Sequence, residues 1–215
     1  MPRLMPLLAL LAPALLAVSA VSLPACRNPG PPPMTEPDIT IKQRPDPQKT
    51  YRIEMTIENA PGPFAVVEGV AHYSVSNHFE CGHIDPVPGV ASRITTSPPI
   101  VWTPLGDGRY ETTVHEDLLV DEDYYGRGVC HWEFVEAGAI LKATGTAGET
   151  RFLPSISAEK IAAQKTMTLY FPAERYPTSE MADFGDHGHS SLEKYKPEFR
   201  DTLFSITLFA KGVEP

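Results

Sequence analysis

Four side chains that could bind a metal ion lie close together in the sequence: Asp183, Asp186, His187 and His189. Carboxylates and imidazoles are common ligands of divalent metals, and the two histidines could instead serve a hydrolase. The short spacing and the neighbouring glycines favour a solvated loop. The chain also lacks a Gly-x-Ser-x-Gly nucleophile motif, a Walker loop, a His-Glu-x-x-His motif and a dinucleotide fingerprint. We therefore predict that the protein is not an enzyme and holds no metal and no cofactor, with a histidine hydrolase as an alternative.

Residues 1–25 have the features of an export signal. Arg3 supplies a positive charge, the residues up to Ser22 are mostly apolar, and small residues precede Cys26. This order is typical of a secretory signal. A transmembrane helix is the competing interpretation, but Pro6 and Pro13 interrupt the apolar run. We therefore expect an exported protein.

The end of this signal, Leu23-Pro24-Ala25-Cys26, resembles the bacterial lipobox, in which the cysteine is lipidated and becomes the new N-terminus. The resemblance implies a lipoprotein that contacts the membrane only through the lipid on Cys26. Arg27, rather than the aspartate that commonly retains such proteins in the inner membrane, implies anchoring to the outer membrane. The alternative is cleavage after Ser19 or Ser22, which would release a soluble periplasmic protein.

The two other cysteines allow two chemistries. Cys81-Gly-His83 and Cys130-His131 contain the ligand types of a four-coordinate zinc site, whereas the two thiols alone could form a disulfide. Outside the cytoplasm an odd thiol is a liability, and acylation of Cys26 would leave an even pair. We therefore predict a disulfide between Cys81 and Cys130.

The segment from Asp121 to Arg127 combines acidic and aromatic side chains in the manner of protein interfaces. A calcium loop is disfavoured because Tyr125 and Trp132 occupy positions that need oxygen ligands. The simpler interpretation is a solvated acidic turn before a core strand. The prediction is a surface that binds a protein partner through Asp121, Glu122, Asp123, Tyr124, Tyr125 and Arg127.

The charge of the chain narrows the class of partner. The net charge of −9 becomes −10 without residues 1–25, because these contain one arginine and no acid. An acidic surface disfavours nucleic acid and anionic lipid headgroups. It is compatible with a basic protein partner, and solubility alone would explain it equally well.

The elements that would position these residues are short strands. Alternating apolar and polar residues predict strands at 51–57, 64–75, 100–102, 109–114, 129–135, 139–144, 150–153, 166–171 and 203–209. In 129–135, Cys130, Trp132 and Phe134 would share a buried face. Residues 157–164 are the one expected helix, with Ser157 as a possible N-cap, and residues 172–200 are expected to be irregular.

These elements predict an all-β fold, an antiparallel β-sandwich that is loosely immunoglobulin-like and has one short helix. The 23 prolines of the chain are about twice the usual ~5%, and seven of them lie between residues 27 and 49. The predicted organisation is a signal peptide (1–25), a lipidated N-terminus with a proline-rich linker (26–49), and a binding domain (50–215).

The stretch from Asp121 to Trp132 resembles a family of largely uncharacterised proteobacterial lipoproteins, and the similarity extends over about residues 50–210. It includes 51–57, 60–64, Gly108-x-Tyr110 and 203–209. Members resemble the immunity lipoproteins found beside type VI secretion effectors, notably phospholipase toxins. The resemblance implies a periplasmic inhibitor that blocks an incoming effector and has no catalytic residues of its own. An envelope structural or assembly lipoprotein that binds a resident partner is the alternative.

Overall fold

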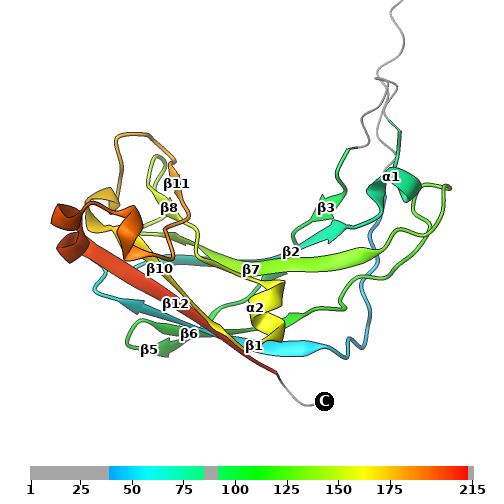
Figure 1. Ribbon diagram of the computed structural model, residues 1–215, viewed down its shortest axis with the longest axis horizontal. Helices are drawn as coiled ribbons and strands as arrows, with labels where there is room; N and C mark the ends of the chain where they lie inside the picture. The colour runs from blue at the N-terminus through cyan, green and yellow to red at the C-terminus, as the bar shows by residue number, and fades with distance from the viewer. Residues whose placement is uncertain (1–38, 85–91, 213–215) are drawn as a thin grey trace, which may run out of the picture. The chain divides into compact units, whose positions relative to one another are not determined.

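The alternating segments form two β-sheets that pack face to face (Figure 1). The computed structural model describes residues 39–84 and 92–212, so the signal peptide and Cys26 lie outside the described residues. No helix within the described ranges is long and apolar enough to cross a membrane.

The first sheet is antiparallel and contains the strands β10, β12, β1, β6 and β5 in that order. Their bounds are Thr166–Pro172, Leu203–Gly212, Thr50–Glu58, Arg109–His115 and Thr103–Gly106. In β1, Ile53 and Met55 are fully buried, whereas Arg52 and Glu54 on the other face are not. This period of two is what the sequence predicts for a half-buried strand.

The second sheet is built around a long pair, β2 (Val66–Val75) and β7 (Trp132–Lys142). Its strand order is β11 (Gly185–Asp186), β8 (Arg151–Phe152), β7, β2 and β3 (Thr95–Thr96). Two short strands complete it, because β4 (Pro99–Ile100) also pairs with β2 and β9 (Ser155–Ser157) with β7. All of these pairings are antiparallel except that of β11 with β8.

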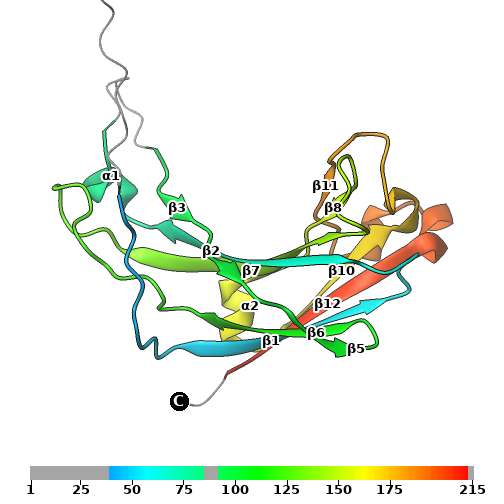
Figure 2. The same cartoon turned by 180° about the vertical axis from the view of Figure 1, so that it is seen from behind.

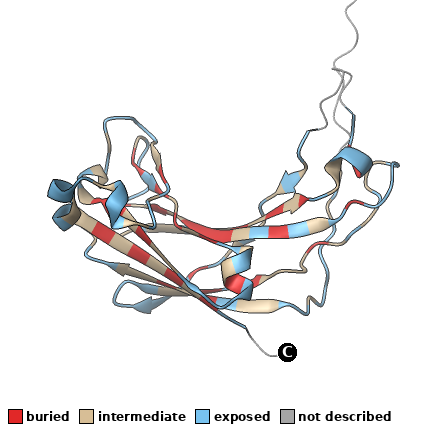
Figure 3. Ribbon diagram, in the orientation of Figure 1, coloured by how far each residue is buried: buried red, intermediate tan, exposed pale blue. Residues whose placement is uncertain are grey.

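The core lies between the sheets, where buried positions of both layers face each other (Figure 3). Phe152 of β8 packs edge-on against Phe171 of β10 and Phe204 of β12, with ring centroids 5.7 and 5.3 Å apart. Burying each such ring stabilises the fold by about 1.5–3 kcal/mol. The predicted all-β sandwich is therefore confirmed.

The predicted strands are corrected at two places. Residues 100–102 were expected as one strand, but Pro99–Ile100 form β4 and Thr103–Gly106 form β5, so Val101 and Trp102 lie between strands of different sheets. The segments 129–135 and 139–144 were expected as separate strands, but residues 132–142 form the single strand β7, with a register shift opposite His72 and Tyr73. Gly138 does not break the strand. A Cβ atom there would lie 2.6 Å from the carbonyl oxygen of Pro154, so the glycine permits the close approach of the neighbouring backbone.

The burial of the tryptophans also differs from expectation. Cys130 and Phe134 are buried as predicted, but Trp132 is only half-buried. Trp102 is the buried tryptophan, and its indole N–H donates to the carbonyl oxygen of Gly138.

The predicted helix exists as α2 (Ala158–Ala162), preceded by an extended Ser157 whose side chain makes no capping hydrogen bond. Further short helices were not predicted: α1 (His78–Cys81), η1 (Ala173–Arg175), η2 (Leu192–Lys194) and η3 (Pro197–Thr202). The helices η1 and η2 lie in the stretch 172–200, which was expected to be irregular, and η3 begins there. An ion pair of 2.8 Å between Arg175 and Asp186 joins two parts of this stretch, and the Tyr195 hydroxyl anchors it to β10 by donating to the Tyr170 carbonyl.

Residues 39–49, which we call the strap, belong to the domain and not to the linker predicted for 26–49. The strap runs along one end of the sandwich into β1 (Figures 1 and 2). It pairs with residues 116–120: Arg44 N–H donates to the Leu118 carbonyl at 2.7 Å, and Val120 N–H to the Lys42 carbonyl at 3.0 Å. Ile41 packs against the core. The prolines of the strap are therefore compatible with an extended segment that is docked on the domain, as well as with a free tether.

Candidate functional site

A disulfide joins Cys81, at the end of α1, to Cys130, just before β7, and confirms the predicted pair. Both residues are buried, and the disulfide occupies the two thiols that a zinc site would need. It ties two segments that flank the same sheet. In this respect it differs from the bond between sheets that characterises immunoglobulin domains.

The predicted partner-binding segment wraps around this disulfide. Tyr124 and Tyr125 are half-buried and pack against it, together with Trp132. The Tyr124 hydroxyl donates to the carbonyl oxygen of Val120 at 2.7 Å. Both tyrosines therefore contribute to the folding of this end of the domain.

The acidic members of the segment hold neighbouring backbone. Asp121 accepts hydrogen bonds of 2.9 Å from the backbone N–H of Trp132 and from the His131 ring. Asp123 accepts from the backbone N–H of Arg127, and the Arg127 guanidinium donates to the Gly82 carbonyl oxygen. Asp121, Asp123 and Arg127 remain exposed, so of the predicted surface they are the residues most accessible to a partner.

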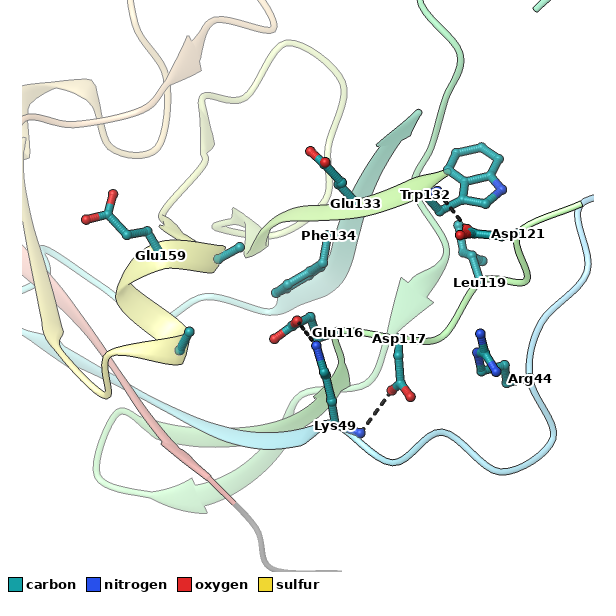
Figure 4. Close-up of a pocket in the computed structure, with 12 residues that line it drawn as sticks. Arg44, Lys49, Glu116, Asp117, Leu119, Asp121, Trp132, Glu133, Phe134 and Glu159 are labelled. Carbon is teal, nitrogen blue, oxygen red and sulfur yellow. Dashed lines mark hydrogen bonds and ion pairs between the residues drawn. The ribbon is translucent and has the colours of Figure 1, made fainter. Parts of the chain in front are cut away.

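Asp121 also lines a cleft of about 460 Å³, which lies between the strap, the end of β6, β7 and α2 (Figure 4). Its apolar part comes from Leu119, Trp132, Phe134, Ala158 and Ala162. Its charged part comes from Arg44, Lys49, Glu116, Asp117, Asp121, Glu133 and Glu159. The cleft therefore offers both apolar contact area and an excess of carboxylates.

Two carboxylates of the cleft are bonded to the strap. Glu116 accepts from the Lys49 ammonium at 2.7 Å and from the Tyr51 hydroxyl at 3.2 Å, and the first bond raises the pKa of Lys49. Burial raises the pKa of Asp117, but hydrogen bonds from the backbone N–H groups of Gln48 and Lys49 help to lower it, so the net pKa is below the ordinary value. Asp117 is thus favoured in its ionised form, and Glu116 is fixed in place by its two donors.

Glu133 and Glu159 differ from these two acids. Both are exposed, and neither side-chain carboxylate has a hydrogen-bond or ion-pair partner within the described residues. They lie at the rim of the cleft, and Glu133 points to the opposite side of β7 from Phe134 (Figure 4). They are available to act on an approaching charged partner.

Four of the acids that line this cleft, Glu116, Asp117, Asp121 and Glu133, belong to the most acidic part of the chain. Residues 111–136 contain eight acids (Glu111, Glu116, Asp117, Asp121, Glu122, Asp123, Glu133 and Glu136) and one base, Arg127, which is 1 − 8 = −7 of the total −9. The strap has the opposite character, with Lys42, Arg44 and Lys49 against Asp46. A basic segment of the chain is therefore already seated on its most acidic one.

The other predicted candidates lie at the opposite end of the domain. Asp186 is buried and paired with Arg175, His187 is exposed, and the His189 ring packs edge-on against Tyr195. In residues 39–84 and 92–212 no group of three or more histidine, cysteine or acidic side chains is arranged to hold a metal. Asp186 thus has a structural role in which its carboxylate joins two parts of the 172–200 stretch.

Comparison of the chain with protein-family models, with curated proteins and with solved structures finds no significant match. The assignment of the candidate site therefore rests on the geometry of the site alone. The strap and the cleft were not predicted from the sequence. The signal that could have found them is the contrast between the basic residues of 39–49 and the acidic residues of 111–136.

Proposed function

We propose that the protein is an exported, lipid-anchored periplasmic binding protein that captures a basic protein partner at the acidic end of its sandwich. The observation that carries this proposal is a cleft with apolar walls that is lined by five carboxylates and two basic side chains. Four of the carboxylates belong to residues 111–136, where eight acids and one base give a net charge of −7. Charges of one sign around a concave site attract an oppositely charged partner, and apolar walls add contact area.

The immunity role follows from the family resemblance of the 121–132 stretch. A cognate antibacterial effector, such as a phospholipase, would be neutralised when the acidic end covers its active site. The disulfide supports export, because such bonds persist mainly in oxidising compartments.

Binding suits this site better than catalysis. Glu116 and Asp121 accept hydrogen bonds that fix a neighbouring side chain and backbone, and backbone hydrogen bonds help to hold the pKa of Asp117 below its ordinary value. A general acid or base would instead need a pKa near the working pH. The carboxylates of the cleft are therefore suited to attract and orient a partner.

The test is to measure binding between the full chain and the protein encoded by the neighbouring gene, and protection of cells against that protein. The variant Glu133→Lys/Glu159→Lys reverses the two unpaired charges at the rim. It should slow association about three- to tenfold at low ionic strength and change dissociation little, because rim charges act mainly on the encounter.

The matched control is Glu193→Lys/Glu198→Lys, which makes the same charge change on η2 and η3 at the opposite end of the domain (Figure 1). It should leave the association rate close to that of the wild-type chain. Equal slowing by both double variants would mean that only net charge matters, and the acidic end would lose its assignment. Tyrosine-to-alanine variants are less suitable here, since Tyr124 and Tyr125 pack on the disulfide.

A further inference from the structure

Two lysines of the strap bind carboxylates that belong to the acidic residues 111–136. The Lys49 ammonium lies 2.7 Å from Glu116 at the cleft, and the Lys42 ammonium lies 2.7 Å from Glu122 in the predicted binding segment. In both pairs the bond to the carboxylate raises the pKa of the lysine. The chain thus places its own ammonium groups where a basic partner would place its groups.

The backbone of the strap is held independently of these pairs. Arg44, Gln48 and Lys49 donate backbone hydrogen bonds to Leu118 and Asp117 at 2.7–3.0 Å. The lysine side chains are by contrast 59% and 62% exposed, so their ion pairs are weak and screened by salt. A competing cation can therefore replace either ammonium group while the strap stays docked.

We infer that Lys42 and Lys49 are intramolecular competitors that occupy Glu122 and Glu116 until a basic partner displaces them. The inference rests on the proposed function, since it concerns how the same acidic end is regulated. The competition lowers the affinity of the site for cations in general. A partner gains access only when it supplies further contacts, such as an apolar side chain in the cleft.

The consequence is selectivity against simple cations. Without the two lysines, Glu116 and Glu122 would attract any basic peptide of the envelope. When the two lysines are present, a basic peptide must displace an ammonium group from each carboxylate, and this exchange yields little net free energy. The specific partner is then distinguished by shape and apolar contact.

The experiment uses a fluorescently labelled hexalysine peptide and the full chain at low ionic strength, with the dissociation constant measured by anisotropy. Lys42→Gln/Lys49→Gln should bind the peptide about two- to fivefold more tightly for each lysine removed, as expected for release of an exposed ion pair. The variant is expected to fold, since both side chains are exposed, and a thermal melt checks this.

The control is Lys194→Gln/Lys196→Gln, which removes the same charge from exposed lysines at the opposite end of the domain. A gain with the strap variant that clearly exceeds the gain with this control supports the competition. Equal gains from both variants overturn it, because they would report net charge alone.

A third arm separates this inference from the proposed function. Glu116→Gln/Glu122→Gln, introduced into the strap variant, should return the affinity to that of the wild-type chain or weaker. If these carboxylates matter but the strap lysines do not, the competition fails and the acidic site stands. If hexalysine binding ignores both the carboxylates and the lysines, the acidic site itself is wrong.

Discussion

Glu149 is a buried carboxylate whose position depends on neutral donors. It accepts hydrogen bonds from the backbone N–H and the hydroxyl of Thr144, the latter at 2.6 Å, and from the N–H of Gly145 at 3.0 Å. The Thr144 hydroxyl is the main cause of a lowered pKa for Glu149. A short turn after β7 is thereby closed by one ionised side chain.

This lowered pKa predicts a pH dependence. A carboxyl group whose folded-state pKa lies below its unfolded value stabilises the fold fully above the unfolded pKa. For Glu149 the stabilisation should be present above the ordinary value of 4.5 and be lost as the pH falls below it toward the folded-state pKa. Glu149→Gln should therefore lower the free energy of unfolding at neutral pH and flatten its fall below pH 4.5. Urea titrations across that range test this, and parallel curves for variant and wild type would contradict it.

At the scale of elements, the end of the domain that carries the Cys81–Cys130 disulfide keeps short segments in place without regular strand pairing. Asn77, just before α1, donates to the carbonyl oxygen of Val129 and accepts from the backbone N–H of His131. These bonds and the disulfide fix the segment 121–130 against α1. The segment that the sequence marks as a binding surface is thus positioned by covalent and polar contacts more than by strand pairing.

Loss of the disulfide should destabilise the whole domain. The bond closes a loop with a sequence separation of 49 residues, for which chain entropy predicts about 4 kcal/mol. Cys81→Ser/Cys130→Ser should lower the free energy of unfolding by about 2–5 kcal/mol in urea titrations. Reductant should destabilise the wild-type chain comparably and leave the double variant unchanged. Free thiols in the denatured, unreduced wild-type protein would show that the pair is not bonded.

At the scale of the whole molecule, the strap connects the N-terminal part of the chain to the acidic end of the sandwich. Because Arg44 and Lys49 of the strap line the cleft, the segment that leads into the domain is also part of the candidate binding site. A lipid on Cys26 would then attach the binding domain at the end that carries the site.

The anchor itself is testable. Cys26→Ala should yield unprocessed or soluble protein, because in the proposed lipoprotein the thiol of Cys26 is the group that is acylated. Metabolic labelling with a palmitate analogue, followed by membrane fractionation, measures both effects. Label on the Cys26→Ala chain would show that the lipid lies elsewhere or that the sequence has been misinterpreted as a lipobox.

The sequence by itself determined the period-two strands and the pairing of Cys81 with Cys130. These depend on local alternation and on the small number of thiols. Local signals of this kind survive without knowledge of the partner strands.

Only the tertiary structure decided that the strap docks, that Tyr124 packs against the disulfide, and that Glu116 and Lys49 meet at a cleft with Phe134. The paired residues Lys49 and Glu116 lie 67 positions apart. Their proximity follows from the pairing of β1 with β6 in one sheet and the packing of β7 in the other. Local alternation carries no information about such pairings, because it specifies which face of a strand is buried and not which strand lies beside it.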